Sequence, residues 1–338
     1  MDALVWEAPG TMNMRQWSDP QPAAGEVLID VAYAGICGSD LGGYLGHNAL
    51  RVPPLVMGHE FSGVVVALGE GVGRQIEIGQ KVTCNPMLAC GECRFCRSDM
   101  AHLCTSRKLI GAHRPGAFAE RVAAPQEAVY ALPDSINLRA AAIVEPVAVA
   151  MRISRLAGDV SGETVLVIGA GPIGLLALQA IRMKSPARIF VSDIDPERLA
   201  MAESLGAVAV DPASRDLIAE VHRATEGLGA GVTIDAVGSA GTRAASVAAT
   251  RSAGKVLLSW LHEEASAFPA SEVIRREIEV KGAFCYTGED FQDAIDAVAA
   301  GQMRLDPWIV EAPLSEGGHW FKRLVGTPGN VGKVLLIP

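Results

Sequence analysis

The sequence has no long uninterrupted apolar run, no run of like charges, no internal repeat and no low-complexity segment. Its longest apolar stretch, residues 165–181, contains three glycines and a proline, and residues 140–151 are split by Glu145 and Pro146. A membrane-spanning helix needs about 20 consecutive apolar residues. We therefore expect no membrane segment and no membrane partner.

Basic residues are also scarce. The chain has 29 Lys and Arg against 38 Asp and Glu, a net charge of −9, which argues against binding to a nucleic-acid backbone. The first six residues lack a basic segment followed by an apolar core, so we expect no signal peptide and a cytoplasmic, reducing location. In that compartment the seven cysteines are expected to bind metal rather than to form disulfides.

The chain is long and apolar enough for two domains, with 338 residues of which 49% are hydrophobic. Residues 1–151 are predicted to form a β-rich domain with long loops. From residue 152 to 284 short apolar strands alternate with helices, which predicts a doubly wound parallel sheet covered by helices on both faces. Residues 285–338 are predicted to add one helix and one strand that pack back on an earlier domain. The fold class is therefore α/β.

The element predictions follow from the period of the apolar residues and from Gly and Pro at the boundaries. The predicted strands are 26–34, 61–67, 81–84, 164–168, 188–192, 207–210, 232–235, 255–259, 279–283 and 333–337, and the predicted helices are 172–183, 289–300 and one that is capped by Asp195 and ends at Gly206.

A glycine-rich turn lies between the strand at 164–168 and the helix that follows. Its sequence is Gly169-Ala170-Gly171-Pro172-Ile173-Gly174. In a dinucleotide site the first glycine permits the tight turn, the second lets a pyrophosphate approach the backbone, and the third lets helix and strand pack closely. The glycines alone fit an ordinary strand-to-helix turn equally well.

Asp193 strengthens the dinucleotide interpretation because it ends the next predicted strand, where a carboxylate accepts hydrogen bonds from both ribose hydroxyls of the adenosine half. A carboxylate at that place repels the 2′-phosphate of NADP. Arg198 could attract that phosphate only if Asp193 were turned away. The pattern therefore favours NAD over NADP.

Four cysteines, Cys90, Cys93, Cys96 and Cys104, follow the spacing C-x2-C-x2-C-x7-C. Four thiolates at such spacings can surround Zn²⁺ tetrahedrally and leave no position for water, which defines a structural zinc site. An iron–sulfur cluster is the alternative for four cysteines. The expected role is to fix a loop, at about residues 84–110, that has few apolar residues of its own.

A second set of possible ligands is spread along the chain: Cys37, His59, Glu60 and Glu145. One thiolate, one imidazole and one or two carboxylates are typical of a zinc ion that keeps a position for substrate. Bound there, an alcohol has its pKa lowered and a carbonyl is polarised. Taken singly, however, a histidine in a glycine-rich turn is more often structural, and Glu145 could simply pair with an arginine.

Together these residues resemble the zinc-containing medium-chain dehydrogenase/reductase superfamily, and within it the polyol (sorbitol-type) and threonine-type dehydrogenases. The resemblance covers essentially the whole chain. It rests on the order and spacing of Cys37-Gly38-Ser39-Asp40, Gly58-His59-Glu60, the four-cysteine loop, Gly116-Ala117-Phe118-Ala119-Glu120, Glu145-Pro146 and the glycine-rich turn.

The resemblance implies a GroES-like β domain that carries two zinc ions per chain, one catalytic and one structural, and a Rossmann domain that binds NAD, with the active site between them. Cys37 and His59 correspond to catalytic zinc ligands. Glu60 and Glu145 correspond to carboxylates that bind the metal directly or through water. Glu145 stands where other alcohol dehydrogenases have a second cysteine, which favours the polyol branch.

Ser39 resembles the hydroxyl that bonds the alcohol at zinc and passes on its proton. Many members carry a relay histidine where this chain has Gly42. Three replacements stay open: a water molecule, which we favour because Gly42 has no side chain to exclude it, another group such as His47, or an impaired turnover step.

The function expected from the resemblance is hydride transfer between a secondary alcohol, polyol or sugar derivative and NAD. The alternatives are a dehydrogenase of β-hydroxy amino acids such as threonine, and a silent NAD(H)-binding scaffold. We also expect a homo-oligomer, a dimer or tetramer, with residues 255–260 and 279–286 as the candidate face. Arg51, Arg114 and Arg275 stay open as contacts for a phosphorylated substrate.

Overall fold

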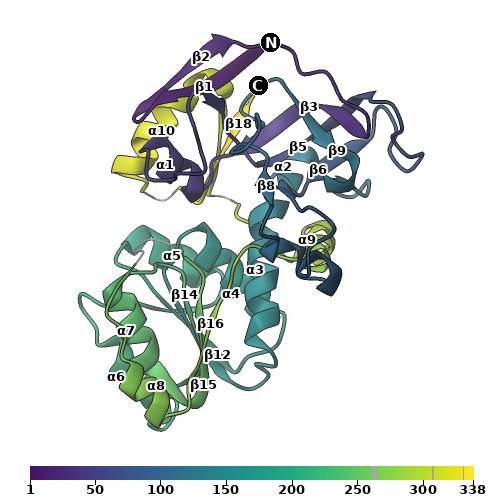
Figure 1. Cartoon of the computed structure of the whole chain (residues 1–338). Helices are drawn as coiled ribbons and strands as arrows, with labels where there is room; N and C mark the ends of the chain where they lie inside the picture. The colour runs from purple at the N-terminus through teal and green to yellow at the C-terminus, as the bar shows by residue number, and fades with distance from the viewer. Residues whose placement is uncertain (261–264, 307, 330) are drawn as a thin grey trace. The chain divides into compact units, whose positions relative to one another are not determined.

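The computed structural model describes residues 1–260, 265–306, 308–329 and 331–338. Its contacts divide the chain into two units (Figure 1). Unit 1 comprises Met1–Glu145 and Thr287–Pro338, and unit 2 comprises Pro146–Tyr286. Among the described residues, no helix is long and apolar enough to cross a membrane.

Unit 1 is built on a sheet with the strand order β10-β6-β5-β3-β18-β17, in which β9 also pairs with β3. Two smaller sheets, β2-β1-β4 and β7-β8, accompany it. The strands of unit 1 are β1 (Asp2–Ala8), β2 (Thr11–Gln16), β3 (Glu26–Gly35), β4 (Leu55–Val56), β5 (Glu60–Leu68), β6 (Lys81–Cys84), β7 (Met87–Leu88), β8 (Lys108–Leu109), β9 (Arg121–Pro125), β10 (Val129–Ala131), β17 (Ile309–Pro313) and β18 (Lys333–Ile337). Its helices are α1 (Gly38–Tyr44), α2 (Leu138–Ala141), α9 (Gly288–Ala299) and α10 (Gly317–Gly326), with short 3-10 turns at Cys96–Ser98, Ala101–Leu103, Gln126–Ala128 and Leu314–Glu316.

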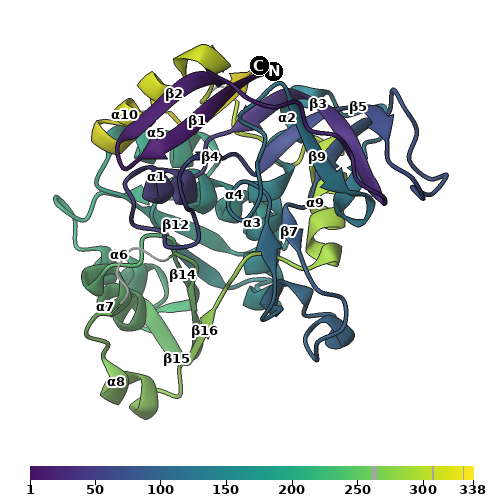
Figure 2. The same ribbon diagram turned by 45° about the horizontal axis from the view of Figure 1, so that its top comes forward.

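The core of unit 1 joins the two ends of the chain. Phe321 of α10 lies edge-on to Phe118, with ring centroids 5.8 Å apart, and 5.4 Å from the ring of Tyr44 in α1. Helix α10 also packs against β2, and both termini lie close together (Figure 2). The C-terminal segment thus packs against α1, the helix that follows Cys37.

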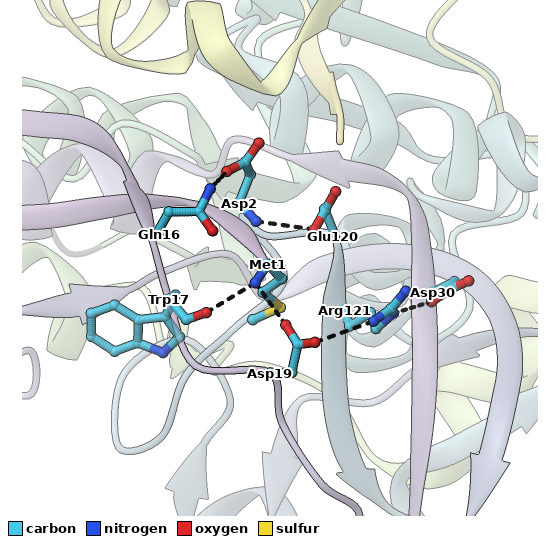
Figure 3. Close-up of polar contacts among 8 residues, drawn as sticks. All are labelled: Met1, Asp2, Gln16, Trp17, Asp19, Asp30, Glu120 and Arg121. Atoms are coloured by element: carbon cyan, nitrogen blue, oxygen red, sulfur yellow. Dashed lines mark hydrogen bonds and ion pairs between the residues drawn. The ribbon is translucent and has the colours of Figure 1, made fainter.

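Polar contacts fix the start of the chain to the main sheet (Figure 3). The amino group of Met1 donates to the carbonyl oxygen of Trp17 at 3.0 Å and pairs with Asp19 at 2.7 Å. Arg121 of β9 pairs with Asp30 at 2.9 Å and Asp19 at 3.6 Å. The side chains of Arg121, Asp19 and Asp30 are 41–49% exposed, and ion pairs between exposed groups are screened by water and add little to stability. They orient the first strands, while the apolar core supplies the stability.

Unit 2 is a six-stranded parallel sheet with the order β13-β12-β11-β14-β15-β16, the order of a Rossmann fold. Leu166 and Ile168 of β11 pack against α6 and α7, whereas Val167 faces α4, so helices cover both faces (Figure 1). The strands are β11 (Thr164–Ile168), β12 (Arg188–Ser192), β13 (Val208–Val210), β14 (Ala230–Asp235), β15 (Thr250–Leu258) and β16 (Glu279–Gly282). The helices are α3 (Val144–Ala157), which begins at the end of unit 1, α4 (Pro172–Arg182), α5 (Pro196–Ser204), α6 (Leu217–Ala224), α7 (Ala240–Ala249) and α8 (Ala270–Arg275).

The prediction of a single helix and a single strand after residue 284 was wrong, because α10 and β17 also form there. Helix α10 begins with two glycines, which are poor helix formers, so the sequence pattern did not predict a helix there. A side chain at Gly317 would overlap Leu4 of β1, so the glycine permits close packing. Strand β1 was missed because its residues 3–6 are buried in succession and show no alternation.

Candidate functional site

Strand pairing brings Cys37, His59 and Glu60 together. Strands β3 and β5 are antiparallel, with Gly35 opposite Glu60, so the residues just after β3 meet those at the start of β5. One ligand atom from each of the three residues lies within 4.8 Å of the other two. His59 and Glu60 are only 5% and 1% exposed. Cys37 is half-buried. A sulfur, an imidazole nitrogen and a carboxylate oxygen gathered in this way fit a zinc ion.

Asp40 lies behind His59. Its Oδ1 faces Nδ1 of His59 at 3.2 Å, and its Oδ2 accepts a hydrogen bond of 3.1 Å from the backbone N–H of Cys37. Burial alone would raise the pKa of Asp40, but His59, Arg51 and the Cys37 N–H lower it to about 2. A carboxylate behind an imidazole fixes the ring and leaves Nε2 for a metal. The sequence analysis assigned no role to Asp40.

Lys333 is a buried cation beside the same group, and the sequence analysis did not find it. Its Nζ forms an ion pair with Oε2 of Glu60 and donates a hydrogen bond of 3.1 Å to the carbonyl oxygen of Ile36. Burial would lower the pKa of Lys333, but Glu60, Cys37 and Glu145 raise it. The ammonium of Lys333 therefore stays charged beside these ligand candidates.

Glu145 lies in the first turn of α3 and is half-buried. Within the described ranges its carboxylate is not part of the group formed by Cys37, His59 and Glu60, although it acts electrostatically on Lys333. Its role at a metal stays a prediction.

Ser39 lies beside Cys37, and its hydroxyl donates to the Cys37 sulfur at 3.5 Å. The position expected for a relay histidine is open, because a Cβ placed on Gly42 would meet no atom within 4 Å. His47 follows α1 and is exposed. Room for water therefore exists at Gly42.

The four cysteines of the loop converge. Their sulfurs lie within 4.8 Å of one another, with 3.9 Å between Cys90 and Cys96 and 3.5 Å between Cys93 and Cys96. Four thiolates about 2.3 Å from one zinc ion would lie about 3.8 Å apart. The strand pair β7-β8 closes the base of the loop, and among the described residues no member of the unit 1 core cluster falls between 89 and 109.

The pKa values of these thiols differ sharply. The backbone N–H of Cys96 lowers the pKa of Cys93 to about 6, whereas desolvation and the neighbouring thiols raise that of Cys96 to about 12. Four sulfurs this close together are favourable when a metal cation binds them and displaces the thiol protons, because the ligand form of cysteine is the thiolate. The loop fits a structural zinc ion.

Each glycine of the turn in unit 2 has its own steric reason. Gly169 has a φ of +100°, which favours glycine, and a side chain at Gly174 would overlap the carbonyl oxygen of Gly169. A Cβ at Gly171 would meet only a guanidinium nitrogen of Arg198, at 4.0 Å. Gly171 precedes Pro172 and Ile173, the first residues of α4, so the helix N-terminus is approachable, as a pyrophosphate requires.

Asp193 faces that turn. Its carboxylate accepts hydrogen bonds from the backbone N–H of Ala170 at 2.6 Å and of Asp195 at 3.0 Å. Asp195, and not Asp193, caps helix α5 through the N–H groups of Glu197 and Arg198. Asp193 therefore lies at the glycine turn, and each of its oxygens, which accepts one backbone N–H, keeps a lone pair for a ligand.

Comparisons with known proteins agree with this arrangement. Residues 23–134 match the alcohol dehydrogenase GroES-like domain, and residues 172–300 match the zinc-binding dehydrogenase family. The chain is 35% identical to 2-dehydro-3-deoxy-L-galactonate 5-dehydrogenase of Pseudoalteromonas atlantica, over 91% of this chain and 90% of that one. It is 34% identical to D-arabitol-phosphate dehydrogenase of Enterococcus avium (99% and 97%) and 36% identical to L-threonine 3-dehydrogenase of a Chelativorans species (99% and 98%).

Solved structures are similar over the whole chain. An alcohol dehydrogenase from Escherichia coli CFT073 in complex with NADH has a TM-score of 0.92 and 28% identity, covering 100% of this chain and 99% of that one. A zinc-binding dehydrogenase from Sinorhizobium meliloti 1021 bound to NADP has a TM-score of 0.91 and 31% identity, with the same coverage. The chain belongs to the zinc-dependent medium-chain dehydrogenases of the alcohol dehydrogenase superfamily, and the family and fold class predicted from the sequence are confirmed.

Proposed function

We propose that the protein oxidises a secondary alcohol of a polyol or sugar derivative with NAD⁺, using one catalytic and one structural zinc ion. The observation that carries this proposal is the group of one half-buried thiol, one buried imidazole and one buried carboxylate, in which Asp40 faces the imidazole. The test is a screen of diols, polyols, sugars and hydroxy amino acids, following the absorbance of the reduced cofactor. If protein with two bound zinc ions oxidised none of these alcohols, the proposed function would be refuted.

In the proposed reaction Cys37, His59 and Glu60 hold the catalytic zinc, with Glu145 as a further carboxylate. A zinc ion held there supplies positive charge that lowers the pKa of a substrate hydroxyl, and the nicotinamide supplies the hydride acceptor. The side chains of the protein position the metal ligands and move the substrate proton. Asp40 fixes the His59 ring. Ser39 would take up the substrate proton at Oγ, and its own hydrogen, which points toward Cys37 in this structure, would turn to a water molecule in the open space at Gly42 and pass to it.

The four-cysteine loop is proposed to hold the structural zinc. All seven cysteines are free thiols, which fits a reducing compartment such as the cytoplasm. In Cys96→Ser we expect the zinc content to fall from two ions to one, because a serine hydroxyl replaces a thiolate ligand. The unfolding midpoint should fall by roughly 6–12 °C, the shift for about 3 kcal/mol in a unit of this size. Metal analysis and thermal unfolding check both values, and two zinc ions in the variant would contradict the assignment.

NAD is proposed over NADP because the Asp193 carboxylate faces the glycine turn. Like charges brought together cost several kcal/mol, so we expect kcat/KM to be about 100-fold higher with NAD⁺ than with NADP⁺. Asp193→Asn keeps an oxygen that accepts from Ala170 but removes the charge, and should narrow the ratio to about 10-fold or less. Steady-state kinetics with both cofactors measure this ratio. Arg198→Met is the matched control, since a loss of NADP⁺ use there would assign the phosphate contact to Arg198 instead.

The three arginines considered for a phosphorylated substrate already have partners. Arg51 pairs with Asp40 at 2.9 Å, Arg114 pairs with Glu26 at 2.6 Å, and the exposed Arg275 pairs with Glu272 at 2.8 Å. These three arginines therefore give no specific support for a phosphorylated substrate, and phosphorylated polyols belong in the same screen. The 36% identity with an L-threonine 3-dehydrogenase keeps a β-hydroxy amino acid as the second candidate, which the same screen separates.

We also propose a homo-oligomer that forms through the edge of the unit 2 sheet. Strand β16 is the last in the strand order and pairs only with β15 among the described strands, and three of its four residues are exposed. An open strand edge can pair with a second copy. Light scattering measures whether the particle is a dimer, a tetramer or a monomer.

A further inference from the structure

Arg51 is a buried arginine for which the proposed reaction has no role. It lies in the segment between α1 and β4, and its side chain is only 1% exposed. The residues on either side, Leu50 and Val52, are 54% and 71% exposed. The backbone therefore runs along the surface of unit 1. The two apolar side chains, Leu50 and Val52, point outward, and the charged side chain between them is buried. Burial of a guanidinium is costly unless the group is paired.

Among the described residues, the Arg51 side chain donates hydrogen bonds to two partners, and both join it to the group around Cys37. One terminal nitrogen donates to Oδ1 of Asp40 at 2.9 Å and to Oγ of Ser39 at 3.3 Å. The same Oδ1 faces Nδ1 of His59 at 3.2 Å. Arg51 thus touches the hydroxyl that lies beside Cys37 and the carboxylate that orients His59.

The contact with Ser39 fixes the direction of its hydroxyl group. A guanidinium has only donors, so Oγ of Ser39 must accept from Arg51 and cannot point its hydrogen there. The hydrogen is left to point toward Cys37, to whose sulfur it donates at 3.5 Å. One lone pair of Oγ stays open to take a proton.

Gly43 makes the space for Arg51. A Cβ on Gly43 would lie 2.5 Å from Cδ and 3.1 Å from Nε of Arg51, so any larger residue would push the arginine away. The adjacent Gly42, by contrast, faces open space. The two neighbouring glycines of α1 therefore differ, and only Gly43 is required for the arginine to reach Asp40 and Ser39.

We propose that Arg51 is a positioning residue for the dehydrogenase reaction, seated by Gly43, that holds the Ser39 hydroxyl with its hydrogen directed toward the Cys37 side. This inference rests on the proposed function. Arg51 does not touch the substrate; it acts through Ser39. A merely structural role, the neutralisation of buried Asp40, needs only a cation, which lysine also supplies. The side chain of lysine is one bond shorter than that of arginine, so its ammonium does not reach the place from which the single Arg51 nitrogen donates to both Asp40 and Ser39.

The first test compares Arg51→Lys, Ser39→Ala and the double variant. We expect Arg51→Lys to keep two zinc ions and the unfolding midpoint of the wild type, while kcat falls about 10- to 100-fold, the range for residues that orient a metal site, and KM changes little. If Arg51 acts through Ser39, adding Arg51→Lys to Ser39→Ala should lower kcat no further. Wild-type kcat in Arg51→Lys, or multiplicative losses in the double variant, would overturn the proposal.

The second test needs no turnover and covers the case in which Arg51→Lys fails to fold. Gly43→Ala, Arg51→Ala and their double variant form a cycle in the free energy of unfolding. We expect Gly43→Ala to be clearly destabilising in the wild type and much less so in the Arg51→Ala background, because the closest clash is with the arginine, whereas the Met57 sulfur at 3.3 Å belongs to a flexible side chain. If Gly43→Ala changed the free energy of unfolding equally in both backgrounds, the claim that Gly43 makes room for Arg51 would be wrong. Absence of turnover in zinc-loaded wild type refutes the proposed function, whereas full activity of Arg51→Lys overturns this inference alone.

Discussion

Cys37→Ser is expected to lower kcat by roughly 10³-fold or more, because the several kcal/mol of charge stabilisation that a catalytic metal supplies is lost with its thiolate ligand. The zinc content should fall from two ions per chain to one. Binding of NADH, followed by its fluorescence, should stay within about twofold of the wild type, since the glycine turn and Asp193 belong to unit 2 and Cys37 belongs to unit 1.

The matched control is Cys84→Ala. Cys84 is fully buried, lies outside both groups of metal-ligand candidates in the described residues, and has its pKa raised by burial, so it is an inert thiol. We expect this variant to retain both zinc ions and its turnover while losing some stability. Normal turnover by Cys37→Ser, or zinc loss in Cys84→Ala, would show that the catalytic centre has been assigned to the wrong cysteine.

Much of the fold could be predicted because the element boundaries are local signals. Strands β6, β11, β12 and β18 have the bounds predicted from their apolar residues and flanking glycines or polar residues. Asp195 caps α5 as its sequence indicates, because an aspartate followed by proline suits the first turn of a helix. The four cysteines could also be found, since their spacing alone brings them into one loop.

The surroundings of the group at Cys37 could not be predicted in the same way. Lys333 reaches Ile36 across 297 residues of sequence, and a lysine that begins an apolar strand gives no sign that its ammonium is buried. Arg51 and Asp40 are ordinary charged residues in the sequence, and only the tertiary structure buries both. Local patterns identify the ligands. Which charged residues hold the ligands in place depends on tertiary burial, which the sequence around Asp40 and Arg51 does not reveal, and Lys333 comes in addition from a distant segment.

Lys333→Met is expected to be the most destabilising substitution at this site. Removing one partner of a buried ion pair leaves an uncompensated charge and typically costs about 3–5 kcal/mol. In this variant the Glu60 carboxylate, which is 1% exposed, would be the buried charge without a partner. Because the folded-state pKa of Lys333 is raised, the stability from the pair is fully present below the pKa of the unfolded lysine and is lost only as the pH rises through the folded pKa. The free energy of unfolding that is lost in Lys333→Met should therefore be constant across neutral pH.

The zinc dependence of this loss makes the prediction specific. A zinc ion beside Glu60 supplies the counter-charge that methionine cannot, so the cost should be largest in chelator-treated protein and smaller with zinc bound. Denaturant unfolding of both forms measures the difference. The control is Glu60→Gln with Lys333→Met, which removes both charges and should recover most of the stability of the chelated form. A chelated Lys333→Met variant as stable as the chelated wild type would mean that Glu60 is not held as a charged group. In that case Lys333 would not be the cation that keeps this carboxylate ready for a metal.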